Sequence, residues 1–264
     1  MNILVNNYNV NIRTGGYNIN KDKNPTLLLI HGAGMDGTVW QMQTRYLANK
    51  GINVLAVDLP AHGLSEGPSL KSISEMSHWV IKLLDFLNIN SVVIAGHSMG
   101  SLISIETAKN YKSRVKSIIL LGTASLMPVH PDLIKAAKND LSIAANLITD
   151  WSLGKTQHIG NNPSPGAWMI GGSIQLIMNS IKGVLANDLI ACNEYKQASN
   201  LAKNIEQEVL IISGQEDKMT PVKKAKELST IFKNCNMVVI YDAGHMMMME
   251  DPTKVAQLMY KQFY

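Results

Sequence analysis

The feature that most constrains the fold is an apolar run that ends at a serine flanked by glycines. Residues 92–95 are Val-Val-Ile-Ala, as in a buried strand, and Gly-His-Ser-Met-Gly follows at 96–100 before a helix-like pattern. In this strand–turn–helix context, Gly-x-Ser-x-Gly predicts a sharp, strained turn that only glycines can flank. We therefore predict that Ser98 is an exposed nucleophile. The Met99 N–H, at the positive end of the following helix, is its candidate oxyanion donor.

Short apolar runs alternate with helix-like patterns through the first half of the chain. Runs typical of buried strands occupy 26–30, 53–58, 92–95 and 115–122, and they return at 208–214 and 237–241. Helical spacing of apolar residues lies between them, at 38–50, 72–87 and 102–111. This order predicts an α/β fold with a mostly parallel, doubly wound sheet, whose ligand crevice lies outside the carboxyl ends of the strands. Residues 3–19, with a turn at Gly15-Gly16, predict an antiparallel hairpin at one edge.

The alternation stops between residues 123 and 202. Helix-like patterns at 133–147 and 174–189 flank a segment at 160–166 that is rich in glycine and proline. We therefore predict a core of residues 1–122 and 203–264 with a helical insertion at 123–202. Its large side chains could line a pocket or simply pack between helices, and the candidates are Trp151, Trp168, Met169, Met178 and Tyr195.

Composition excludes several classes of protein. The chain has 264 residues, 46% of them hydrophobic and 17% charged, which fits one sizeable globular core. The net charge of +4 is scattered and forms no basic tract, so we expect no nucleic-acid partner. No uninterrupted apolar run of about 18 residues occurs, so we expect no membrane span. The two cysteines, Cys192 and Cys235, are far apart and fit reduced thiols in a cytoplasmic protein.

Two later strand ends carry an acid and a base. Asp217 follows the run at 208–214 and precedes Thr220-Pro221, which we predict to start a helix with Thr220 as its N-cap. His245 follows a glycine after the last strand. A carboxylate at this edge can fix the tautomer of a neighbouring histidine, so we predict His245 as general base and Asp217 as its partner. A lone histidine is more often just a satisfied polar side chain, and Glu216 and Asp58 are rival carboxylates.

These motifs together resemble the α/β-hydrolase family over nearly the whole chain. That family has the order serine, acid, histidine, in which Asp58 would come too early. Gly-x-x-Asp-x-x-Thr-Pro at 214–221 matches its acid loop, and Ala243-Gly244-His245 matches its histidine loop, although Asp242 departs from the usual glycine. The resemblance implies that residues 123–202 form a lid.

The resemblance also assigns a second oxyanion donor. His31-Gly32-Ala33-Gly34 follows the strand at 26–30, and in the family the residue after His-Gly donates the second N–H, which is Ala33 here. Alone, this segment could be only a tight turn. Residues 32–37 also spell G-x-G-x-x-G, a weak dinucleotide signal that explains less of the chain than the serine motif does. We expect no cofactor and no metal.

The expected activity is a serine hydrolase. Ser98 would attack the carbonyl of a small, largely apolar ester, thioester or lactone, with Asp217, His245, Ala33 and Met99 in the roles given above. Two alternatives stay open: a C–C bond or enol-lactone hydrolase, and a ligand receptor that keeps the same residues without catalysis. The partner is a small molecule in every case, and the sequence leaves the oligomeric state open.

Overall fold

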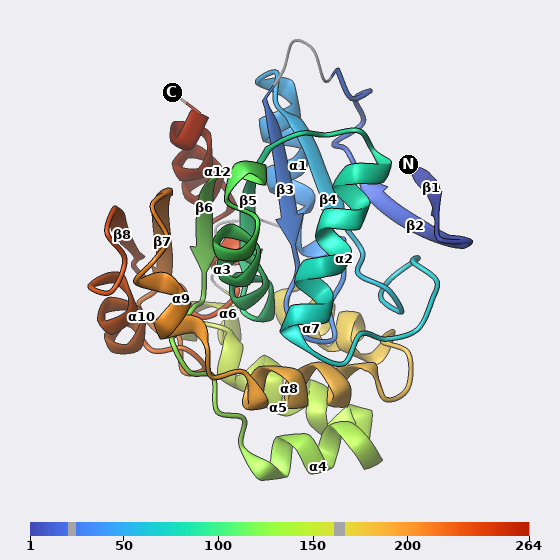
Figure 1. Cartoon of the computed structure of the whole chain (residues 1–264). Helices are drawn as coiled ribbons and strands as arrows, with labels where there is room; N and C mark the ends of the chain where they lie inside the picture. Colours follow the sequence, from blue (N-terminus) through green and yellow to red (C-terminus); the bar gives the residue numbers. More distant parts are fainter. Residues whose placement is uncertain (21–24, 161–166, 264) are drawn as a thin grey trace.

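The strands form one twisted sheet in the order β1-β2-β4-β3-β5-β6-β7-β8 (Figure 1). The computed structural model describes residues 1–20, 25–160 and 167–263. Strands β3 to β8 pair in parallel, and only β1 and β2 run antiparallel to their neighbours. The predicted α/β sheet with an edge hairpin is confirmed. The strands are β1 (Asn2–Val5), β2 (Tyr8–Arg13), β3 (Thr26–Ile30), β4 (Asn53–Val57), β5 (Val92–His97), β6 (Val115–Leu121), β7 (Glu208–Gly214) and β8 (Cys235–Ile240).

The hairpin turns earlier than we predicted. Val5 pairs with Tyr8, so the turn residues are Asn6 and Asn7, at φ 50° and 68°. Asparagine tolerates this left-handed region better than most residues do, which suits it to a two-residue turn. The predicted turn at Gly15-Gly16 is wrong because these glycines lie beyond the end of β2.

Helices cover both faces of the sheet, and alternate residues of each central strand point to opposite faces. Leu28 and Ile30 of β3 pack in the core beneath α2 and α3, whereas Leu27 and Leu29 pack in the core beneath α1 and α12. Burial on both faces explains why these strands read as continuous apolar runs. The covering helices are η1 (Gly37–Trp40), α1 (Gln41–Asn49), α2 (Ile73–Phe86), α3 (Met99–Asn110), η2 (Lys112–Arg114), α10 (Val222–Ser229), α11 (Met247–Glu250), α12 (Pro252–Tyr260) and η3 (Lys261–Phe263).

The segment between β6 and β7 is helical and lies at the end of the sheet toward which the strands point, at the bottom of Figure 1. It comprises α4 (Pro131–Asn139), α5 (Leu141–Ser152), α6 (Lys155–His158), α7 (Met169–Met178), α8 (Val184–Glu194) and α9 (Ala198–Ala202). Side chains of α4, α5, α7 and α8 share a small core of their own. In the described part of the chain, no helix has both the length and the apolar character needed to span a bilayer.

Each long helix predicted in the insertion is in fact two. The pattern at 133–147 breaks at Asp140, whose carboxylate accepts the Ser142 and Ile143 N–H groups and so caps a new helix. The pattern at 174–189 breaks over residues 179–183: α7 ends at Met178 with Asn179 as its cap, and Gly183, at a left-handed φ of 89°, precedes the first residue of α8. Of the predicted breaker segment 160–166, residues 161–166 lie outside the described residues.

Candidate active site

Ser98 occupies the sharp turn that its motif predicts. It lies between β5 and α3 with φ 53° and ψ −115°, a strained conformation for a residue other than glycine. A Cβ at Gly96 would lie 2.0 Å from the Gly100 carbonyl oxygen, and one at Gly100 would lie 2.4 Å from the Ile30 carbonyl oxygen. Both neighbours are backbone atoms that cannot move aside, so both positions require glycine. The turn leaves Ser98 half-buried at the mouth of a cavity.

Asp217 and His245 meet at the carboxyl end of the sheet. His245 Nδ1 lies 2.8 Å from Asp217 Oδ2, and both side chains are buried. Because the carboxylate accepts from Nδ1, the neutral ring carries its lone pair on Nε2. Nε2 is buried without a hydrogen-bond partner among the described residues, and His245 lines the same cavity as Ser98. An imidazole in this state can accept a proton from a group in the cavity.

The Asp217 carboxylate is held ionised by its neighbours. Its Oδ1 accepts the Met219 and Thr220 N–H groups at 2.8 Å each, and Oδ2 accepts the Thr220 hydroxyl at 2.7 Å. Burial raises the pKa of Asp217, but His245 and these hydrogen bonds outweigh burial and keep the pKa below its ordinary value. Thr220 therefore braces Asp217, and our prediction that it caps the next helix is wrong, since Pro221 is the cap residue of α10.

The rival carboxylates are engaged elsewhere. Glu216 accepts the Lys155 N–H at 2.6 Å. Asp58 accepts hydrogen bonds from two side chains and two backbone N–H groups, which are those of Arg13 and Asn11 and of Gly37 and Leu64. Both side chains therefore have structural partners.

Two backbone N–H groups next to Ser98 have no acceptor among the described residues. One belongs to Met99 at the first position of α3, and the other to Ala33 in the loop after β3. A Cβ at Gly32 would lie 3.3 Å from Ser98 Cβ, so the β3 loop runs directly beside the serine. Unpaired N–H donors at this place suit an oxygen atom that gains negative charge.

The cavity beside Ser98 is small and mostly apolar. Its volume is about 230 Å³, below the range of pockets that hold drug-sized ligands, and Ser98, Ala33 and His245 open into it. Of the side chains predicted to line a pocket, only Trp151 does so. Trp168 and Met178 are exposed, Met169 packs in the main core, and the Tyr195 hydroxyl donates to Glu106. Apolar lining comes from Met35, Met127, Leu133, Ile148, Trp151 and Leu189.

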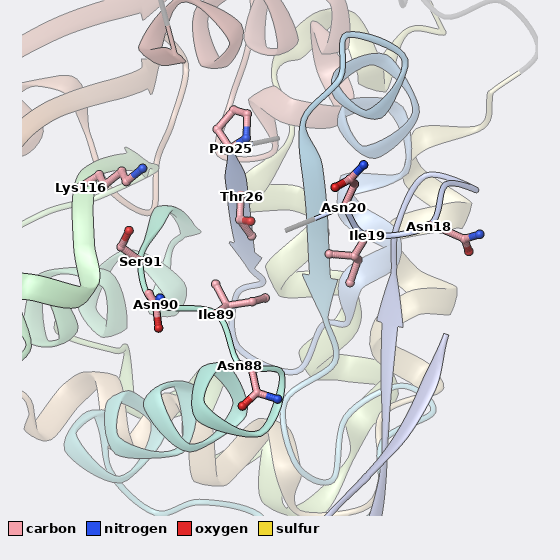
Figure 2. Close-up of a pocket in the computed structure, with 10 residues that line it drawn as sticks. All are labelled: Asn18, Ile19, Asn20, Pro25, Thr26, Asn88, Ile89, Asn90, Ser91 and Lys116. Atoms are coloured by element: carbon pink, nitrogen blue, oxygen red, sulfur yellow. The ribbon is translucent and has the colours of Figure 1, made fainter. Parts of the chain in front are cut away.

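A more open hollow lies at the other end of the sheet. Figure 2 shows that it is lined by polar side chains around the amino ends of β3, β5 and β6, among them Thr26, Ser91 and Lys116. It has a volume of about 870 Å³. Among the described residues that line this hollow, Lys116 alone is titratable, so the hollow offers no acid–base pair.

Glu250 anchors the His245 loop, a role that no sequence motif predicted. The buried carboxylate accepts the N–H groups of Gly244 and Met246 on either side of His245, and that of Gly154 in the insertion, at 2.8 to 3.1 Å. Burial raises the pKa of Glu250, and these hydrogen bonds oppose the increase. An acidic residue five positions after the histidine was the available signal, but nothing local shows which N–H groups it accepts.

We expect Glu250→Gln to lower the free energy of unfolding by about 2 kcal/mol, the cost of leaving buried donors unpaired. Both carboxylate oxygens accept N–H groups, so the NH₂ end of glutamine must face at least one donor. Urea unfolding measures the change. Glu227→Gln is the control, because the Glu227 carboxylate makes an exposed ion pair with Lys224, and losing that pair should change stability by less than about 0.5 kcal/mol. Equal effects of the two substitutions would contradict the anchoring role.

Gly122 makes room for the His245 ring. It follows β6 at φ 56°, and a Cβ there would lie 2.8 Å from Nδ1 and from Cε1 of the ring. We expect Gly122→Ala to displace the imidazole and to lower kcat by roughly 10- to 100-fold. Gly51→Ala is the matched control, since Gly51 has φ 80° but open space around it, so it shares the backbone strain without the clash. Ester hydrolysis by the two folded variants tests this, and similar kcat values would refute it.

Comparisons with known proteins agree with this geometry. The model of the alpha/beta hydrolase family matches residues 27–258. A pimeloyl-[acyl-carrier protein] methyl ester esterase of Aromatoleum aromaticum is 25% identical over 256 residues, covering 89% of this chain and 96% of the relative. The 3-oxoadipate enol-lactonase 1 of Acinetobacter baylyi is 25% identical over 254 residues, covering 93% of this chain and 91% of that relative.

Solved structures show the same architecture. The enol-lactonase from Burkholderia xenovorans LB400 superimposes with a TM-score of 0.87 at 22% identity, covering 99% of this chain and 98% of that one. At this identity the likeness concerns the fold alone. The family model, in contrast, spans the serine turn, the Asp217 loop and the His245 loop. The chain therefore belongs to the alpha/beta hydrolase family.

Proposed function

We propose that this protein is a serine hydrolase that cleaves a carboxylic ester of a small, largely apolar substrate. The observation that carries the proposal is the 2.8 Å contact between Asp217 and His245 at the wall of the cavity that Ser98 also lines. Relatives named as a methyl ester esterase and an enol-lactonase support ester or lactone hydrolysis. The apolar cavity of about 230 Å³ supports a small acyl group.

The chemistry follows from the positions of the polar atoms. His245 Nε2 takes the proton of the Ser98 hydroxyl as Oγ attacks the carbonyl carbon, and the Ala33 and Met99 N–H groups hold the resulting oxyanion. The intermediate collapses to an acyl-serine, and His245 returns the proton to the departing alkoxide. Water, deprotonated by His245, then attacks the acyl group, and Ser98 leaves with the proton. Asp217 stabilises the imidazolium that forms in each half of the reaction.

We further propose that residues 123–202 act as a lid that sets substrate size. Leu133, Ile148 and Leu189 of this segment line the cavity over Ser98, which supports that role. The free thiols of Cys192 and Cys235 support a reducing compartment such as the cytoplasm.

Covalent labelling tests the proposal most directly. A fluorophosphonate probe should attach to Ser98, as read by mass spectrometry of the digested protein, and p-nitrophenyl acetate or butyrate should be hydrolysed. A folded protein that neither reacts with the probe nor turns over these esters would contradict the proposal. It would favour the receptor alternative.

A further inference from the structure

A buried carboxylate of the insertion reaches across to the loop that carries Ala33. Asp188 of α8 is fully buried, and its Oδ2 accepts the Gly34 N–H at 2.9 Å. The same oxygen lies 2.7 Å from His62 Nε2. The contact joins residues 154 positions apart in the sequence, so it ties the insertion to the loop after β3.

His62 and Asp188 form an ion pair. Besides Nε2 on the carboxylate, the ring places Nδ1 2.9 Å from the Pro60 carbonyl oxygen. Both nitrogens face acceptors, so both carry protons and the ring is an imidazolium. Burial lowers the pKa of His62, but Asp188 and the Pro60 carbonyl, with a smaller contribution from Asp58, raise it above its ordinary value. Removing one partner of such a pair without replacing its hydrogen bonds leaves the other as an uncompensated buried charge.

The neighbouring His31 is neutral and fixes the other side of Ala33. Its Nε2 accepts the Leu59 N–H at 3.1 Å, so Nδ1 carries the proton and donates to the Gly32 carbonyl at 2.9 Å. Its ring lies against that of His62, with centroids 4.8 Å apart. Burial, followed by the charge of His62, lowers the pKa of His31 to about 4.

These contacts fix both peptide planes that flank Ala33. The Ala33 N–H and the Gly32 carbonyl belong to one planar peptide unit, which His31 holds through the carbonyl. The Gly34 N–H belongs to the next unit, which Asp188 holds. Gly34 itself has φ 64°, and a Cβ there would lie 2.6 Å from Leu185 Cδ1 of α8. The direction of the Ala33 N–H is therefore set partly by the core and partly by the insertion.

We propose that Asp188 is a positioning residue for the oxyanion hole, through which helix α8 holds the Ala33 N–H in its working direction. The inference rests on the proposed function, because it requires Ala33 to be an oxyanion donor. It also explains why a full charge is buried at the contact between insertion and core. An arrangement that only attached α8 to the core would need no link to this loop.

The chain contains a matched control on the same helix. Asn187 also ties α8 to the core, since its Nδ2 donates to the Leu70 carbonyl at 2.7 Å, and the same nitrogen makes a long contact of 3.4 Å with Asp188 Oδ1. Gly34 and His62 are both held by the other carboxylate oxygen, Asp188 Oδ2, which Asn187 does not contact. Removing Asn187 therefore weakens the attachment of α8 without freeing Gly34.

The test compares kcat, KM and the affinity for butylboronic acid, which forms a tetrahedral adduct with a serine nucleophile. For p-nitrophenyl butyrate, we expect Asp188→Ala to lower kcat by roughly 100-fold, similar to the loss of one oxyanion donor, while KM changes less than about threefold. The boronate affinity should fall with kcat/KM. Asp188→Asn keeps an oxygen for the Gly34 N–H and should recover most of the activity, and Asn187→Ala should stay within about threefold of wild type in kcat.

A double variant covers the case in which Asp188→Ala does not fold. His62→Leu/Asp188→Leu removes both charges together, and proteins often tolerate the replacement of a buried ion pair by apolar side chains. This double variant still leaves the Gly34 N–H without an acceptor. It should show the same loss of kcat. If neither the single nor the double variant lowers kcat more than Asn187→Ala does, the positioning role is wrong. Ser98→Ala run in parallel separates the hypotheses, because an active Ser98→Ala would refute the proposed function itself.

Discussion

Replacing Ser98 with alanine should lower kcat for p-nitrophenyl butyrate by roughly 10⁴- to 10⁶-fold, the range seen when the nucleophile is removed from an intact serine–histidine–aspartate site. The variant keeps the cavity, the Asp217–His245 pair and both free N–H groups. It loses only the oxygen that would form the acyl-enzyme. Steady-state hydrolysis measures the loss, and the fluorophosphonate adduct should disappear with it.

The structure offers a serine control for this experiment. Ser117 is buried in β6, near the amino end of the strand and thus far from the cavity beside Ser98. Ser117→Ala removes a buried hydroxyl of the same kind and should leave kcat within about twofold of wild type. If Ser98→Ala retains activity within tenfold of this control, the nucleophile is another group and the proposed chemistry fails.

The sheet could be predicted because a strand that is buried on both faces appears in the sequence as a continuous apolar run. All five residues of β3 are buried, and β3 and β7 run over the residues expected from their apolar runs. The errors came where one side chain overrides a regular pattern. Asp140 and the turn at 179–183 each divide an amphipathic run into two helices, and Asn6-Asn7 turn the hairpin before the glycines are reached. Apolar spacing does not reveal these local choices.

In the candidate site, too, some features could be predicted from the sequence and others could not. Ser98 and the Asp217–His245 contact were predictable, since each follows a strand whose carboxyl end must lie at one edge of the sheet. The carboxylates that hold the neighbouring loops were not predictable. Asp188 meets Gly34 through a separation of 154 residues, and Glu250 joins the histidine loop to Gly154 across 96. Such contacts depend on how the helices pack against the sheet, and no short segment of sequence determines that packing.

Replacing Asp217 with asparagine should lower kcat by roughly 10³- to 10⁴-fold at neutral pH, because it reverses the tautomer of His245. Two backbone N–H groups donate to Oδ1, so the amide oxygen of asparagine must occupy that position. The NH₂ group then takes the place of Oδ2 and donates to His245 Nδ1. The imidazole proton moves to Nε2, which can no longer accept the proton of Ser98.

Glu216→Gln is the matched control for this substitution. It removes the same charge from the adjacent residue, whose carboxylate accepts the Lys155 N–H and makes no contact with His245. We expect its kcat to stay within about threefold of wild type. If the Glu216 variant lost more activity than the Asp217 variant, the two carboxylates would have to exchange their proposed roles.

Acid unfolding separates the catalytic effect of Asp217 from its effect on stability. Its pKa is lower in the folded protein than in the unfolded chain, so between the two values the unfolded state binds more protons and stability rises with pH. The Asp217 contribution is therefore complete above the unfolded pKa of about 3.9 and is lost as the pH falls through the folded pKa. The difference in unfolding free energy between wild type and Asp217→Asn should shrink as the pH falls below about 4. A loss of kcat at pH 7 in a variant that is still fully folded would then belong to the changed tautomer and the lost carboxylate charge, whereas a loss that follows the unfolded fraction would overturn that explanation.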